Sequence, residues 1–280
     1  MSFSVDNPPT RISFSELTPT MDTLGYYAVE MMRLIFNFQE FPLSFEIEAD
    51  APEDLLEHSP KFKLLEFLNA YLKVENAVHL NADALKDVMR AKEVSQSQVA
   101  QALSKLNPDR AVFNLNAANT IAEKYNAQRP SELSTFLKTH PSSYNPAKRK
   151  DTTIVLLYNP DTHDAVCKSL DYHAGRSDVA AIAFDLGLMI CPAKPNAESF
   201  KEFKPIDDYG IASRHMLNSY EYAGALGPDN IYAAVEAMNQ AGIRSPKLST
   251  RGGVMRDKIF DFDLAHRFLS EIRKFQKQYK

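Results

Sequence analysis

The stretch that decides the fold is residues 152–190, TTIVLLYNPDTHDAVCKSLDYHAGRSDVAAIAFDLGLMI. Two apolar runs in it, Ile154–Tyr158 and Val179–Phe184, have the composition of buried β-strands. The residues between these runs are mostly polar, and they include two histidines, several carboxylates and one of the two cysteines of the chain. This stretch therefore predicts part of a sheet and the first place to look for a functional site.

Two structures fit the residues between the two runs. In one, Asp161 or Thr162 caps a helix that ends near Tyr172, which gives a strand–helix–strand unit and a parallel sheet. In the other, residues 165–172 form a strand that turns at residues 174–176 and pairs with the second run as a hairpin. We favour the hairpin, because polar and apolar residues alternate there and a helix of about ten residues makes a cramped crossover.

Outside this stretch the periodicity of apolar residues predicts mainly helices, with one short strand or extended linker at Leu43–Ile47. The expected helices are Met21–Asn37, a segment from Pro60 to about Lys73, segments beginning at Asn81 and Ser95, Asn116–Asn126, Asn230–Gln240 and an amphipathic segment after Asp263.

These elements predict an α+β (or α/β) fold, with a helical N-terminal half and a small mixed or antiparallel sheet with flanking helices in the C-terminal half. The expected organisation is a mainly helical region at 1–140, a linker at 141–151, and an α/β region with a C-terminal amphipathic helix at 152–280.

Composition limits the class of protein. The chain has 280 residues, of which 44% are hydrophobic and 24% are charged, as in globular proteins with a substantial core. A net charge of −4 gives no global attraction to nucleic acid or membrane, and two cysteines are too few for a disulfide framework. The sequence shows no secretory signal pattern and no apolar run long enough to span a membrane. We expect a cytoplasmic protein.

On the hairpin interpretation, His163 opens one strand and Asp185 ends its partner, so imidazole and carboxylate would meet as a general base and its orienting group. This order of elements, over residues 115–188, resembles the YopJ-type acetyltransferases and the clan CE cysteine proteases. The resemblance implies a bacterial effector that acts on or binds host proteins, with His163 and Asp185 catalytic. It implies secretion into a host cell without a classical signal peptide as the alternative to a cytoplasmic location. It also implies acetyl-CoA and an inositol phosphate as cofactors.

That family uses a cysteine nucleophile downstream of the acid. Cys191 follows Asp185 but lacks the glycine that the family places after its cysteine, and Cys167 lies four residues from His163. Both are candidates, although a small buried hydrophobe is the ordinary role of a residue placed like Cys167. A catalytically inactive, binding-only relative is the alternative to an enzyme.

Two further features suggest ligands or partners. A basic, glycine-bearing segment carries Lys247, Arg251, Arg256 and Lys258, and it is a candidate anion-binding site. Residues 85–106 resemble the first two helices of a repressor-type helix-turn-helix domain, so the alternative function is a protein-interaction or DNA-contacting helical module. The spacing of histidines, cysteines and acids predicts no metal site.

Overall fold

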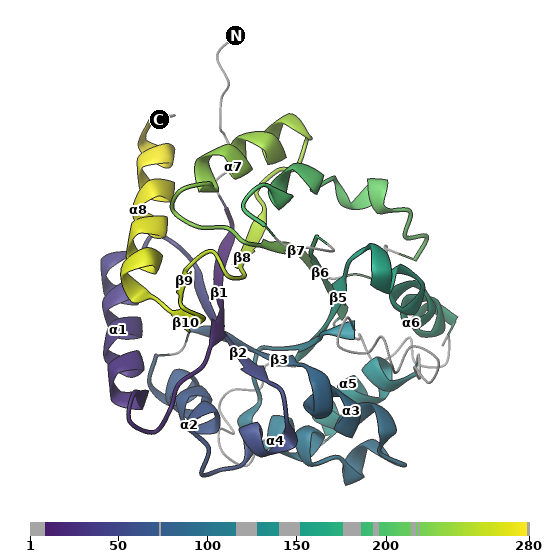
Figure 1. The fold of residues 1–280 in the computed structure, drawn as a ribbon. Coiled ribbons are helices and arrows are strands. Elements are labelled where there is room, and N and C mark those ends of the chain that lie inside the picture. Colours follow the sequence, from purple (N-terminus) through teal and green to yellow (C-terminus); the bar gives the residue numbers. More distant parts are fainter. Residues whose placement is uncertain are drawn as a thin grey trace.

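The computed structural model describes residues 9–72, 74–115, 128–139, 152–175, 186–192, 196–213, 217 and 219–278. Within these residues, eight strands form one closed barrel (Figure 1). In barrel order they are β1 (Arg11–Leu17), β2 (Leu43–Ala49), β3 (Glu75–Leu80), β4 (Arg110–Phe113), β5 (Thr153–Tyr158), β6 (Leu186–Ile190), β7 (Ser219–Gly224) and β8 (Lys247–Thr250). Every neighbouring pair is parallel, and β1 pairs with both β2 and β8, which closes the barrel.

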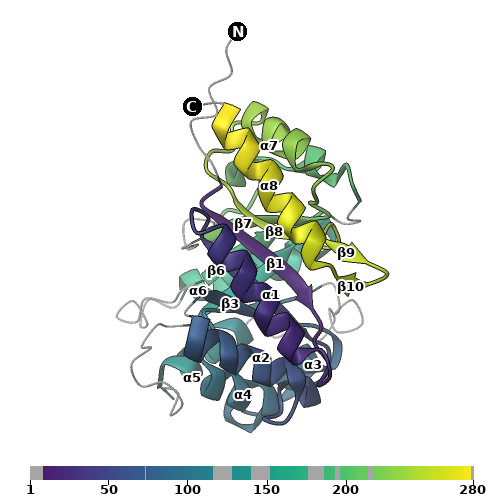
Figure 2. The same cartoon turned by 90° about the vertical axis from the view of Figure 1, so that its left-hand side faces the viewer.

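Helices surround the barrel as an outer ring, and Figure 2 shows α1 and α8 against the outside of β1. The α-helices of the described residues are α1 (Leu24–Asn37), α2 (Pro60–Phe67), α3 (Ala82–Arg90), α4 (Gln98–Leu106), α5 (Arg129–Thr139), α6 (His163–Gly175), α7 (Ile231–Gln240) and α8 (Phe262–Gln278). A small hairpin of β9 (Met255–Arg256) and β10 (Ile259–Phe260) follows β8. Parallel strands inside and helices outside are the architecture of a (β/α)₈ barrel.

Alternate residues of a barrel strand face opposite sides of the barrel wall. In β1, Phe14 points outward and its ring packs against those of Phe45 and Phe268, with centroids 6.0 and 6.1 Å apart. The neighbouring residues Ser13 and Ser15 are also fully or almost fully buried, on the opposite face of the strand. The main apolar core therefore lies between strands and helices, and the inside of the barrel has a different, partly polar composition.

The predicted fold class is wrong, because the sheet is a closed parallel barrel and neither small nor antiparallel. The favoured hairpin is also wrong, since residues 163–175 form helix α6. The strand–helix–strand alternative is the structure observed: β5 and β6 pair in parallel, and the 13 residues of α6 lie in the connection between them. The run Val179–Phe184 lies outside the described residues.

Several single elements were predicted correctly. Strand β5 is confirmed, and so are the helices predicted near α1, α2, α3, α4, α7 and α8, with ends that differ by a few residues. The predicted helix at 116–126 and the linker at 141–151 lie outside the described residues. Strands β1–β4 come from residues before that linker and β5–β8 from residues after it, and all of them join the same barrel.

The helix-turn-helix interpretation of residues 85–106 is wrong as well. Helices α3 and α4 form the crossover from β3 to β4, and their apolar side chains Leu85, Val88 and Leu103 are completely buried. After Leu106 the chain enters β4 within four residues, so the position of a recognition helix is occupied by a barrel strand. In the part of the chain that the structure describes, no helix has the length and apolarity to cross a membrane.

Candidate functional site

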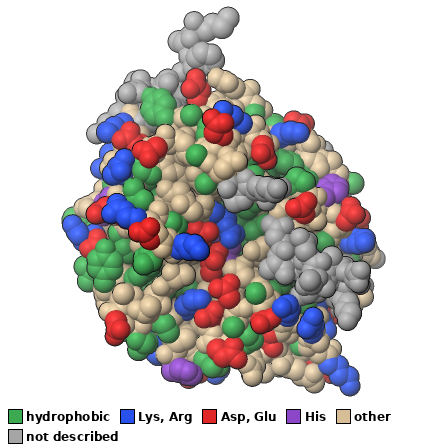
Figure 3. Space-filling view, viewed as in Figure 1, with side chains coloured by type: hydrophobic (Ala, Val, Ile, Leu, Met, Phe, Trp, Pro, Cys, Tyr) green, Lys and Arg blue, Asp and Glu red, His purple; other side chains and the backbone are tan. Residues whose placement is uncertain are grey.

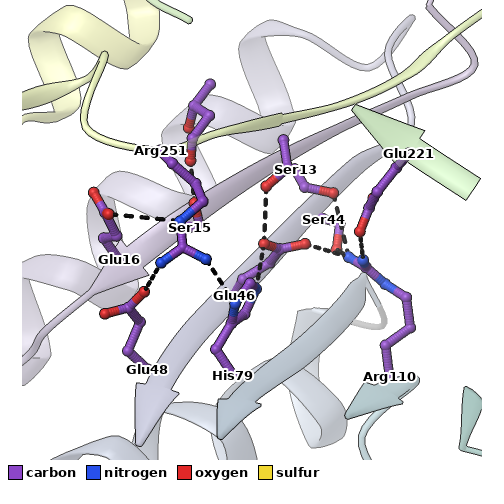
Figure 4. Close-up of polar contacts among 12 residues, drawn as sticks. Ser13, Ser15, Glu16, Ser44, Glu46, Glu48, His79, Arg110, Glu221 and Arg251 are labelled. Atoms are coloured by element: carbon purple, nitrogen blue, oxygen red, sulfur yellow. Dashed lines mark hydrogen bonds and ion pairs between the residues drawn. The ribbon is translucent and has the colours of Figure 1, made fainter. Parts of the chain in front are cut away.

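Charged side chains gather at the carboxyl-terminal end of the barrel, the end at which enzymes of this fold carry their active sites. Glu16, Glu48 and His79 lie near the ends of β1, β2 and β3, and Arg251 directly follows β8. These strands are neighbours, so the four side chains converge; we call them the mouth cluster (Figure 4). Figure 3 shows acidic, basic and histidine side chains together at the middle of this face.

Arg251 is the centre of the mouth cluster. Its Nη2 donates to Glu48 Oε1 at 2.9 Å, its Nη1 lies 3.4 Å from His79 Nδ1, and its Nε lies 3.9 Å from Glu16 Oε1. Burial lowers the pKa of Arg251, but neighbouring acidic groups that include Glu48 and Glu16 outweigh burial and raise it. The guanidinium is therefore charged, and a side-chain exposure of 15% leaves it reachable by a small molecule.

His79 lies one step deeper, between Arg251 and the buried Glu46. Its Nε2 is 2.8 Å from Glu46 Oε2, and both side chains are completely inaccessible to water. Burial alone raises the pKa of Glu46, yet the charges and hydrogen bonds of Arg110 and His79 hold it well below its usual range. An ionised Glu46 accepts a hydrogen bond from Nε2–H, and this tautomer leaves the Nδ1 lone pair directed toward Arg251 at the mouth.

Beneath His79, the barrel interior contains a network of buried ions that holds Glu46 in place. Arg110 donates through Nη2 to Glu46 at 2.6 Å and to Ser44 at 2.9 Å, and through Nη1 to Glu221 at 2.5 Å. Arg11 forms a further ion pair with Glu221. Burial lowers the pKa of Arg110, but these carboxylates reverse the effect and raise it. These ion pairs hold Glu46 in place, and Glu46 in turn orients His79 from below.

Glu16 has an unusual backbone and an unusual carboxyl group. Its φ of 67° lies in the left-handed region, and the register of β1 against β2 shifts between Phe14 and Leu17. This shift turns the side chain into the mouth, where Oε2 accepts a hydrogen bond from the Gly252 backbone at 2.8 Å. Burial raises the pKa of Glu16 despite the opposing charge of Arg251. Backbone strain and a raised pKa at one residue are typical of functional sites.

The loops after β7 and β8 pack on each other through two glycines. A Cβ on Gly227 would lie 2.3 Å from the carbonyl oxygen of Gly253, and a Cβ on Gly253 would lie 2.1 Å from that of Leu226. The two loops can approach this closely only without side chains at these positions. Barrels of this fold often bind phosphate at these same two loops.

Of the catalytic residues predicted from the sequence, the structure describes His163 and the two cysteines. His163 begins α6, where its Nε2 lies 3.6 Å from Cys167 Sγ and its Nδ1 lies 3.2 Å from Tyr158 Oη. His163 and Cys167 are close because they lie four residues apart on one helix. Asp185 lies outside the described residues.

The thiols of both candidate nucleophiles have raised pKa values. Burial, with the nearby Asp171, raises the pKa of the Cys167 thiol. Cys191 directly follows β6, where burial raises its pKa to about 12. A thiol with a raised pKa forms little thiolate at neutral pH.

The four predicted anion-binding residues do not share a site. Lys247 begins β8 and Arg251 follows its end, so they lie at opposite ends of the barrel. Arg256 pairs with Asp261 at 3.0 Å, and Lys258 lies in the turn between β9 and β10. Of the four, Arg251 alone belongs to the mouth cluster.

Glu16, Glu48 and His79 were not predicted from the sequence. The available signal was a polar residue at the inward-facing end of successive strands, which requires that the strands be recognised first. Among the described residues, no group of three or more histidine, cysteine or acidic side chains is placed to hold a metal ion.

Of the comparisons with known proteins, one match to a solved structure supports the barrel fold. No family model matches the chain, and neither does any curated protein. A solved structure of dihydropteroate synthase from Xanthomonas albilineans, in complex with indole-2-carboxylic acid and 6-chloroguanine, has 11% sequence identity and a TM-score of 0.50. The match covers 96% of this chain and 93% of that one. A putative orotidine-monophosphate decarboxylase from Toxoplasma gondii has 12% identity and a TM-score of 0.45, over 99% and 94% of the two chains.

At this identity the likeness is one of fold. It nevertheless overturns the resemblance to YopJ-type acetyltransferases and clan CE proteases, and with it the predicted effector role, because the barrel has a different sheet and topology. The expected use of acetyl-CoA and an inositol phosphate depended on that resemblance and loses its basis.

Proposed function

We propose that the chain is an enzyme that moves a proton on a small anionic substrate bound at the carboxyl-terminal mouth of the barrel. The observation that carries the proposal is the line Glu46–His79–Arg251, in which a buried carboxylate orients an imidazole toward a guanidinium. Fold alone does not imply function, so the proposal depends on this geometry.

His79 is the proposed general base. Glu46 accepts a hydrogen bond from Nε2–H, which leaves the Nδ1 lone pair as the basic site. Arg251 Nη1 covers Nδ1 at 3.4 Å, so Nδ1 takes a proton from the substrate once the guanidinium has turned to pair with the substrate anion. The imidazolium that forms is stabilised by the negative charge of Glu46, as in other carboxylate–histidine pairs.

Glu16 is the proposed general acid. Its raised pKa increases the protonated fraction at neutral pH, and its backbone holds the carboxyl group on the same side of the mouth as Arg251. An acid and a base on either side of one guanidinium suit a reaction that removes a proton at one substrate atom and returns it at another.

Arg251 is the proposed binding group for the substrate anion. A guanidinium pairs with two oxygens of a carboxylate or phosphate in a planar arrangement, and it stabilises negative charge that develops during proton removal. The glycine-bearing loops after β7 and β8 lie beside it and favour phosphate as the anion.

The test is solvent exchange, which needs no knowledge of the product. A panel of small phosphorylated and carboxylated carbonyl compounds is incubated with the protein in D₂O, and NMR measures incorporation of deuterium at carbon. We expect exchange with at least one compound and a decrease of about 10²- to 10⁴-fold for His79→Gln. His58→Gln, on the exposed surface, is the matched control and should keep the wild-type rate. Equal rates for wild type and His79→Gln would contradict the assignment.

A further inference from the structure

A separate cavity of about 380 Å³ lies beside the barrel mouth, a volume that fits one ring system. It lies between the ends of β5 and β6 and the two short helices η8 (Ser199–Glu202) and η9 (Ile206–Tyr209). Six of its lining residues carry the argument: Tyr158, Cys191, Glu202, Phe203, Asp208 and Tyr209. We call it the ring pocket.

The aromatic walls of the ring pocket are held in place by their neighbours. The rings of Tyr158 and Tyr209 meet edge to face, with centroids 5.3 Å apart and planes at 78°. Tyr209 Oη accepts a hydrogen bond from the Lys204 backbone at 3.0 Å, and Tyr158 Oη is 3.2 Å from His163 Nδ1. Phe203 packs on Tyr222 at 5.1 Å. Rings fixed before binding present flat apolar surfaces at little entropic cost.

The charges that line the ring pocket are mainly negative. Glu202 and Asp208 line it, and Lys204 is the single basic residue among its lining side chains. Burial, with the nearby Tyr158, Glu202 and Asp208, raises the pKa of Tyr209 to about 12, so its phenol is neutral at physiological pH. Neutral tyrosine rings and excess carboxylate attract a cation and repel an anion.

We infer that the ring pocket binds a flat aromatic or heteroaromatic ring that carries a positive charge. The aromatic walls recognise the ring through stacking and cation–π contact, and Glu202 and Asp208 recognise the charge. This ligand differs in charge from the anion proposed at the mouth, and its binding does not depend on the proposed reaction.

The pocket is nevertheless next to the mouth. Cys191 lines it and also belongs to the apolar cluster inside the barrel, with Leu157 and Met189. A ring bound there would lie at the edge of the barrel opening, as part of the substrate or as a second ligand.

Three probes separate ring recognition from charge recognition. Benzamidine has a ring and a positive charge, benzoate has a ring and a negative charge, and acetamidine has the charge without the ring. Ligand-observed NMR titration of the full chain should give millimolar binding for benzamidine and binding at least about tenfold weaker for the other two. Benzoate that binds as tightly as benzamidine, or benzamidine that does not bind, would overturn the inference.

Variants at two neighbouring aspartates test whether benzamidine binds in the ring pocket. Asp208→Asn should weaken benzamidine binding by about three- to tenfold, since it removes one lining carboxylate. Asp207→Asn is the matched control, because Asp207 lies on the same short helix but does not line the pocket. Tyr209→Leu, which removes an aromatic wall, should also weaken binding, and circular dichroism checks that each variant is folded. Equal affinities for the two aspartate variants would overturn the assignment to this pocket.

Discussion

Glu46→Gln tests the buried network that orients His79. Glu46 is completely buried and accepts hydrogen bonds from Arg110 at 2.6 Å, from His79 at 2.8 Å and from Ser249 at 3.0 Å. Removing one partner from a buried ion pair costs about 3–5 kcal/mol. Arg110 keeps its ion pair with Glu221 in the variant, so we expect the lower end of that range, about 3 kcal/mol of unfolding free energy at pH 7.

The lowered pKa of Glu46 predicts how the stability difference between wild type and Glu46→Gln changes with pH. The folded-state pKa of Glu46 lies well below its ordinary value of 4.5, so its stabilising contribution is present above pH 4.5. That contribution is lost as the pH falls toward the folded-state pKa. Urea unfolding at pH 7 and at decreasing pH should therefore show a difference between wild type and Glu46→Gln that shrinks under acidic conditions.

The control for this comparison is Glu57→Gln, which removes an exposed partner of Lys105 and should change stability little at either pH. A cost below about 1 kcal/mol for Glu46→Gln at pH 7, or a cost that grows toward low pH, would refute the reasoning.

Three further outcomes follow from the structure. Purified His79→Gln should keep wild-type secondary structure by circular dichroism, so that its loss of exchange activity reflects a lost base. Gly253→Ala should destabilise the protein by at least about 2 kcal/mol in thermal or urea unfolding, because the added Cβ would clash with the backbone of Leu226 and Gly227. Gly25→Ala is the contrast: the added Cβ has open space in α1, and the variant should be more stable by about 0.5–1 kcal/mol. With a thiol reagent at pH 8, partly exposed Cys167 should react before Cys191, whose burial and pKa of about 12 protect it until urea unfolds the chain.

The sequence predicted helices better than strands, and the inside of the barrel explains the difference. Strand β5 was recognised because Ile154–Tyr158 is apolar on both faces. In β1, Arg11, Ser13 and Ser15 interrupt the apolar residues, so the segment lacks the continuous apolar run of β5 and was not predicted as a strand. β4 has only four residues and begins with a buried arginine. A barrel interior that contains ions weakens the hydrophobic pattern on which strand prediction depends.

The prediction of a hairpin at residues 165–176 was wrong for a different reason. Alternation at residues 165–172 was given more weight than the capping residues before it, yet Asn159 accepts a hydrogen bond from the Thr162 backbone and begins the helical segment. The capping residues favour helix α6 over a strand in this segment. The parallel pairing of β5 with β6 makes the segment a strand–helix–strand unit.

The mouth cluster could not be predicted by motif, because its residues are separated by long stretches of sequence and come together only when the barrel closes. Arg251 was identified as a candidate for anion binding, although with three residues that lie elsewhere. Glu16, Glu48 and His79 each look like an ordinary polar residue until the strand that carries it is known.

The most direct test of the central claim is ¹⁵N NMR of His79 in protein labelled at histidine, with inorganic phosphate as the probe. We predict that the neutral ring carries its proton on Nε2 and that phosphate shifts the Nδ1 resonance, because the anion joins Arg251 beside it. Arg251→Gln should abolish the phosphate effect. A proton on Nδ1, or a His79 resonance that phosphate leaves unchanged, would contradict the account.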